Sequence, residues 1–163
     1  MQYRGNTMKD KRIKANDSTT LYQGNVTVKL MRGRKPYRTI NIKNNGTQEF
    51  FRILCHSVAG DNFNNLMPAY VSVSHDNTPL TGVKPHYTTV EVTSSEGVYY
   101  TEFTFVIPGN YLIPGVVNKI ILSNVNGDDL ATVELGEDDQ FEIEDTSSNI
   151  MITWVLSFNN PAS

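Results

Sequence analysis

The sequence predicts an all-β fold: an antiparallel two-sheet β-sandwich of about eight or nine strands, with one short amphipathic helix and an extended N-terminal arm. Short segments in which apolar and polar residues alternate recur along the chain, and turn-forming residues separate them at ordinary loop lengths. Only one segment has apolar residues at helical spacing. Because each strand of a sandwich buries one face, alternation of this kind is the pattern that its two sheets require.

The chain of 163 residues has the length of one domain with one core. We expect residues 1–22 to form an extended polar and basic arm and residues 23–163 to form the sandwich domain. The arm lacks apolar periodicity, which is typical of a segment that orders only against a partner. It carries five cations, Arg4, Lys9, Lys11, Arg12 and Lys14. Without interleaved aromatic residues, these cations favour a protein-docking or merely solvated arm over nucleic-acid binding.

Residues 24–43 have the alternation of a β-hairpin, with Val26, Val28 and Leu30 on one face. Turn residues at 33–36 predict a four-residue loop between its two strands. The tip of this hairpin is basic and contains Arg32, Arg34, Lys35 and Arg38. It is interpreted either as a solvated loop or as a contact for an acidic neighbour.

The helix is predicted just after this hairpin, where apolar residues recur at helical spacing and Gly60 supplies a stop. Its apolar residues are Phe50, Phe51, Leu54 and Val58. We expect the helix to lie across a sheet and close one end of the core. Cys55, the only cysteine, is expected to be a small buried apolar residue of this helix, and it excludes an internal disulfide.

The middle of the chain predicts a strand at residues 69–74, a loop at 75–85 and a hairpin formed by residues 86–93 and 98–107. In the last third, strands are predicted at 116–122 and 130–135, with a short strand starting at Phe141 and Ile143. The closing strand has a large apolar residue at every second position, and Trp154 is at its centre. Those residues are Ile150, Ile152, Trp154, Leu156 and Phe158.

The charges are strongly segregated along the chain. Residues 1–52 hold 12 of the 14 Lys and Arg with three acids, whereas residues 53–163 hold two cations with 14 acids. The turn at residues 136–140 contains the acids Glu137, Asp138 and Asp139. Such complementary halves can join neighbouring copies or pair within one fold.

No combination of residues predicts catalysis, a cofactor or a metal site. His75, Asp76 and His86 flank one loop, but the three histidines lack the spacing of metal ligands. The acidic turn that follows Asn124 does not have the order of a calcium loop. The N-terminal residues have no signal-peptide pattern and no apolar run is long enough to cross a bilayer, which predicts assembly in a cytoplasm.

The order of several elements resembles small virion proteins of tailed bacteriophages. The resemblance rests on the hairpin at 26–42, the Asn-x-Gly-Thr break at 44–47, Phe50-Phe51-x-x-Leu54, and the closing alternation around Trp154. Within this group, the chain is similar to tail-collar and fibre-attachment modules and to auxiliary head proteins. The resemblance implies a structural role with no catalytic residues. Fibre shafts often contain short repeats, and their absence here argues against a shaft.

We therefore expect a non-enzymatic structural protein of a virion, assembled in the bacterial host cytoplasm. It would be an auxiliary head protein or a fibre-anchoring piece that docks on capsid, portal, tail or fibre subunits and forms homo-oligomers. The alternative is a receptor- or glycan-binding module that uses tyrosines and loop acids. The residues expected to contact partners are Arg4, Lys9, Lys11, Arg12, Lys14, Arg32, Arg34, Lys35, Glu137, Asp138 and Asp139.

Overall fold

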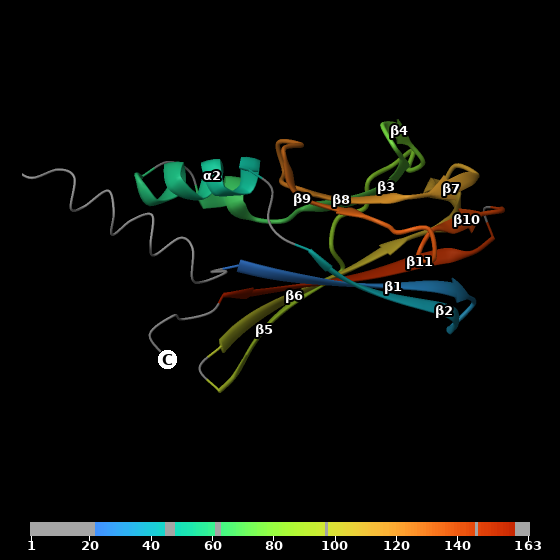
Figure 1. The fold of residues 1–163 in the computed structure, drawn as a ribbon, viewed down its shortest axis with the longest axis horizontal. Helices are drawn as coiled ribbons and strands as arrows, with labels where there is room; N and C mark the ends of the chain where they lie inside the picture. The colour runs from blue at the N-terminus through green and yellow to red at the C-terminus, as the bar shows by residue number, and fades with distance from the viewer. Residues whose placement is uncertain (1–21, 45–47, 61–62, 97, 146, 159–163) are drawn as a thin grey trace, which may run out of the picture.

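The computed structural model describes residues 22–44, 48–60, 63–96, 98–145 and 147–158, and the expected N-terminal arm lies outside them. The strands form antiparallel sheets of five, four and two strands. Figure 1 shows the five-stranded and four-stranded sheets as two facing layers. The predicted all-β sandwich is therefore confirmed, with eleven short or long strands in place of eight or nine.

The larger sheet is organised around the closing strand of the chain. Its order is β2 (Lys35–Asn44), β1 (Tyr22–Arg32), β11 (Asn149–Phe158), β6 (Val98–Ile107) and β5 (Thr89–Ser95). In β11, Trp154 lies opposite Val26 of β1 and Phe103 of β6. The next inward-facing row places Ile152 between Val28 and Phe105. The first and last described strands thus pair directly, which the order of elements along the chain does not reveal.

The core lies between the two sheets and is made by the alternating residues expected from the sequence. Val26, Val28, Ile152 and Trp154 are almost fully buried, as are the inward residues of the facing sheet. That sheet has the order β4 (Thr78–Pro79), β3 (Tyr70–His75), β8 (Lys119–Ser123) and β9 (Asp129–Glu134). Burial of one face of each sheet is the main force that holds the layers together.

The prediction of one continuous strand at residues 116–122 is wrong in one respect, because the strand is broken at Asn118. The first part, β7 (Gly115–Val117), pairs with β10 (Phe141–Ile143), whereas β8 pairs with β3. Asn118 uses its main-chain N–H to bond the carbonyl oxygen of Ser74 and accepts a bond from the N–H of Leu135. The chain changes pairing partners at this residue. This change depends on tertiary contacts, which the alternating pattern of apolar and polar residues does not predict.

Both hairpin loops predicted with four residues contain two. Arg32 pairs with Lys35, so only Gly33 and Arg34 form the first turn, and Gly33 has a φ of +60°. A positive φ at the first central position is typical of type II′ hairpin turns, whose twist matches that of the strands. In the second hairpin Ser95 pairs with Val98, so that strand pairing again reaches the turn.

The predicted helix is present as α2 (Gln48–Val58), beside β9 in the layer of the smaller sheet (Figure 1). Ile53 and Ser57, which are one turn apart, are buried, but Val58 is 75% exposed. The expected burial of Val58 is therefore wrong, as is that of Cys55, which is exposed. Both residues point away from the stripe that Ile53 defines, because adjacent helical positions diverge by about 100°.

The side chains of Phe50, Phe51, Leu54 and Phe158 lie outside the described part of the structure. Two short 3-10 helices, η1 (Phe63–Leu66) and η2 (Gly109–Tyr111), occur within loops. In the described ranges, no helix has both the length and the apolar character needed to span a membrane.

Candidate functional site

The basic tip of the β1–β2 hairpin lies at one end of the sandwich, next to the acidic segments that flank β10. Arg32, Arg34 and Lys35 are exposed there. The half-buried Arg38 connects the two regions, because its Nη1 donates to the carbonyl oxygen of Gln140 at 2.9 Å and its Nη2 donates to that of Asp138 at 2.7 Å. Charged donors on main-chain oxygens form strong hydrogen bonds. The hairpin and the turn at 136–140 are therefore joined within one chain.

Arg38 holds this turn through main-chain atoms and leaves its carboxylates available. The turn is closed by main-chain bonds from Asp139 and Gln140 to the carbonyl oxygen of Gly136. The carboxylates of Glu137 and Asp138 are exposed and that of Asp139 is half-buried. In the described part of the chain no ion pair neutralises these three acids. Their negative charge therefore faces solvent.

A cleft of about 560 Å³ separates the hairpin tip from the segment that joins β10 to β11. Its floor is apolar and includes Leu30, Leu112 and Ile150, all buried. Its rim is polar and carries charges of both signs, from Arg32, Tyr37, Arg38, Glu142, Glu144, Asp145, Ser147, Ser148 and Asn149. This lining is more polar than that of most small-molecule sites, which are predominantly apolar with a few polar groups.

Asp145 is the described group on this rim whose titration is clearly perturbed. Its pKa lies below the ordinary aspartate value, chiefly because the Ser147 hydroxyl donates to Oδ1, and also because the Ser147 main-chain N–H donates to the same oxygen at 2.8 Å. The nearby Arg32 charge lowers the pKa further. Each of these interactions favours the ionised carboxylate. Asp145 therefore presents a fixed negative charge across the cleft from the basic tip.

The opposite rim contains a cation–π pair. The guanidinium carbon of Arg32 lies 4.6 Å from the centre of the Tyr37 ring, which is 48% exposed. This contact orients the Arg32 side chain over the ring. The cleft thus combines an aromatic ring, guanidinium groups and carboxylates, which can together bind a polar ligand or a charged protein segment.

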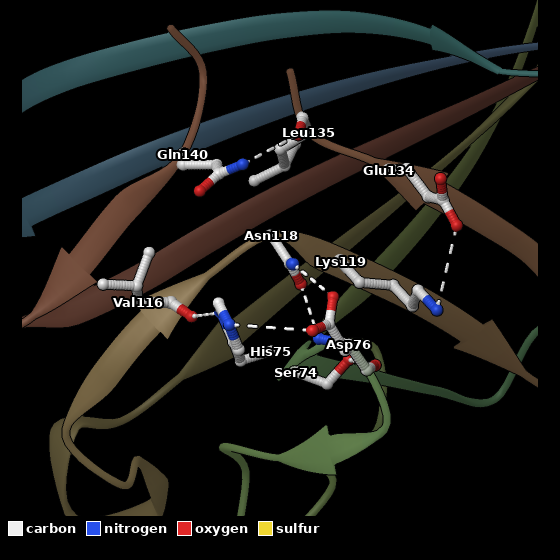
Figure 2. Close-up of polar contacts among 9 residues, drawn as sticks. All are labelled: Ser74, His75, Asp76, Val116, Asn118, Lys119, Glu134, Leu135 and Gln140. Carbon is white, nitrogen blue, oxygen red and sulfur yellow. Dashed lines mark hydrogen bonds and ion pairs between the residues drawn. The ribbon is translucent and has the colours of Figure 1, made fainter. Parts of the chain in front are cut away.

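A second polar network surrounds the β3–β4 turn (Figure 2). The Asn118 side chain donates to Asp76 Oδ1 and accepts from the Asp76 main-chain N–H, both at 2.7 Å. His75 lies between these groups and β7, with Nδ1 2.9 Å from the Val116 carbonyl oxygen and Nε2 3.7 Å from Asp76 Oδ2. Since Asp76 has a φ of +50°, the Asn118 bonds stabilise an otherwise unfavourable backbone conformation. The network is therefore well suited to a structural role.

The structure places His75 and His86 apart, although they flank one loop in sequence. His86 forms a bridge with Tyr70 at the start of β3 and packs against the rings of Tyr70 and Tyr87, whereas His75 is at the end of β3. His75 is five residue steps along extended strand from Tyr70, which is about 16 Å. Among the described residues, no group of three or more His, Cys, Asp or Glu side chains is arranged to hold a metal ion.

Of the residues expected to contact partners, the structure describes six, and it brings them to the same end of the sandwich. Arg4, Lys9, Lys11, Arg12 and Lys14 lie outside the described residues. The sequence prediction did not assign Tyr37, Asp145 or Asn149 to this surface, and it placed Arg38 in the basic tip without listing it among the partner contacts. The Asp-x-Ser spacing at 145–147, which favours a side-chain turn, was a signal for one of them. Comparison with protein-family models, curated proteins and solved structures finds no match to this chain.

Proposed function

We propose that this protein is a non-enzymatic structural component of a tailed phage particle, either an auxiliary head protein or a fibre-anchoring piece. The observation that carries the proposal is the charged end of the sandwich, where the basic hairpin tip and exposed acidic turn lie on either side of Arg38. The likeness of the sequence to small virion proteins supplies the biological setting.

The charged end has the properties expected of a docking surface. Exposed groups of both signs are concentrated there, and complementary charges steer partners and fix their orientation. The Arg38 bonds join the two segments, so that the surface is organised before a partner arrives. Docking on a preorganised surface loses less conformational entropy than docking on free loops. The partners would be capsid, portal, tail or fibre subunits.

The direct test asks whether the protein is present in phage particles whose genome encodes it. Purified, intact particles are analysed by mass spectrometry and labelled with antibodies against the protein. Stoichiometric recovery with particles after density-gradient purification is expected. Recovery only in the soluble fraction of the lysate would overturn the proposal.

A receptor- or glycan-binding module is the second candidate, and the cleft is the observation that favours it. Sugar sites combine an aromatic surface with carboxylate and amide groups, and Tyr37, Asp145 and Asn149 supply these around the cleft. A glycan array, read with and without calcium, tests this candidate with the Tyr37→Ala variant as control. Sugar binding that is lost in the Tyr37→Ala variant would favour the glycan-binding candidate. An array without signal would exclude this candidate.

A further inference from the structure

Strand β5 is an edge strand with one unpaired side. In the described residues it pairs only with β6, and all seven of its residues are exposed. Figure 1 shows the β5–β6 hairpin extending past the strands of the facing sheet, at the end opposite the β1–β2 turn. A free edge presents a row of unpaired main-chain donors and acceptors, to which another strand can be added.

The other edges of the five-stranded and four-stranded sheets have features that discourage strand addition. β2 contains Pro36 and the exposed Lys35 and Lys43, β4 has two residues including Pro79, and β9 contacts both α2 and β2. Proline, lysine and coverage by other elements are the usual protections of an edge. By contrast, β5 has the sequence TVEVTSS, without proline, lysine or a register shift. It is the least protected edge of the five-stranded and four-stranded sheets in the described structure.

The inner face of the same hairpin leaves apolar side chains uncovered. Val90 lies opposite the buried Phe103 and Val92 lies opposite Thr101, so both valines are on the face that elsewhere forms the core. Nevertheless Val90 is 45% exposed, Val92 is 70% exposed and Tyr99 is 64% exposed. The core-facing surface of the larger sheet therefore continues past the smaller sheet, and it ends in apolar residues that face solvent.

We propose that β5 pairs antiparallel with β5 of a second copy, about a two-fold axis at Val92. This register pairs the whole strand, because Val92 is the central residue of Thr89–Ser95. It places the two Val92 side chains opposite each other and covers part of the uncovered apolar surface. The two five-stranded sheets then become one continuous sheet, with a self-complementary contact of the kind that two-fold dimers form.

Charge disfavours the neighbouring register with the axis at Glu91. Within one chain, Glu91 already lies opposite Glu102 on the outer face, a like-charged cross-strand pair. A two-fold axis at Glu91 would place the two Glu91 residues opposite each other and would extend this pair to a row of four carboxylates. With the axis at Val92, Glu91 meets the neutral Thr93 of the second copy. Like charges directly opposite destabilise a pair of strands, so the axis at Val92 is favoured.

This inference deepens the proposed function by naming a second copy as one partner, and it rests on that function only for its biological setting. Self-association is measured on the purified full chain, whereas particle incorporation is measured separately. A monomeric protein that is found in particles would overturn the β5 pairing alone. A dimer that is absent from particles would overturn the virion role alone.

Cysteine crosslinking tests both the pairing and its register. In a Cys55→Ser background, Val92→Cys places two thiols opposite each other, whereas Val90→Cys places them about four residues apart along the paired strands. Under mild oxidation we expect a disulfide-linked dimer from Val92→Cys and little from Val90→Cys. Equal crosslinking of the two variants, or none from Val92→Cys, would overturn the proposed register.

Sedimentation provides an independent measurement of association. We expect the unmodified protein to sediment as a dimer, and Val92→Lys to raise the dimer dissociation constant by about tenfold or more. Val125→Lys, at another exposed valine far from β5 in sequence, should leave the constant unchanged. Circular dichroism establishes that both variants are folded. A monomeric unmodified protein, or equal effects of the two lysines, would contradict the proposal.

Discussion

Arg38 on β2 donates a hydrogen bond to the main-chain carbonyl oxygen of Gln140, 102 residues later in the chain. This bond and its companion to Asp138 fasten the β1–β2 hairpin to the turn that precedes β10. The basic first part of the chain and the acidic last part therefore meet within one molecule. The contact uses main-chain oxygens, which leaves the acidic side chains of the turn exposed.

Replacing Arg38 should destabilise the fold measurably. Arg38→Gln removes a charged donor from two carbonyl oxygens, one of them in a half-buried bond, so we expect a loss of about 1–3 kcal/mol in the free energy of unfolding. Urea denaturation measures this loss. Arg34→Gln, on the exposed turn, is the matched control and should change stability by less than about 0.5 kcal/mol. Equal values for the two variants would show that the Arg38 bonds do not stabilise the fold.

Truncation of Trp154 should have a much larger effect. The side chain is fully buried at the centre of the sheet, so Trp154→Ala should cost about 3–5 kcal/mol of unfolding free energy. Circular dichroism is the appropriate measurement, since the chain has one tryptophan and its fluorescence disappears with the substitution. The neighbouring Thr153→Ala, on the outer face, should cost less than about 1 kcal/mol. A small effect at Trp154 would contradict its central place in the core.

Asp145 should titrate below the ordinary aspartate range, and Ser147→Ala should raise its pKa toward that range. Because the folded-state pKa is depressed, the stabilisation is present above the unfolded-state pKa. It is lost as the pH falls through the folded-state pKa. Carboxyl NMR titration measures both variants, and Ser148→Ala is the control that should leave the pKa unchanged. An unshifted Asp145 in the unmodified protein would contradict the hydrogen bonds described at this site.

Asn118→Ala should weaken the junction of β7 and β8. It removes both bonds to Asp76 and leaves the positive φ of that residue unsupported, with an expected cost of about 1–2 kcal/mol. Thermal unfolding measures the loss. Asn110→Ala, on the exposed part of η2, should be nearly neutral. An equally neutral Asn118→Ala would contradict this prediction. It would mean that water replaces the Asn118 side-chain bonds without loss of unfolding free energy.

Charge reversal of Glu137, Asp138 and Asp139 to Lys should reduce particle incorporation without unfolding the domain. The fold should persist because Arg38 contacts the carbonyl oxygens of Asp138 and Gln140, which the substitutions retain. Incorporation is measured by immunoblotting of purified particles, and circular dichroism monitors folding. The amide triple Glu137→Gln, Asp138→Asn and Asp139→Asn preserves side-chain size and should have an intermediate effect. Normal incorporation of the lysine triple would remove this turn from the docking surface.

Local patterns in the sequence determined the fold class and most of the strands. The alternation around Val28 and Trp154 identifies the buried faces correctly, because a strand exposes successive side chains to opposite sides. The helix ends near Gly60 as expected, since glycine readily adopts the positive φ that terminates a helix. Such features depend on neighbours along the chain.

Pairing between distant segments was decided only by the tertiary structure. The alternating pattern of β11 does not specify β1 and β6 as its partners, and that of residues 116–122 does not reveal the break at Asn118. Nor does the pattern of β5 show that Val92 extends beyond the facing sheet. The sequence alone determined which faces are apolar, whereas the packing of the two sheets decided which of those faces are covered.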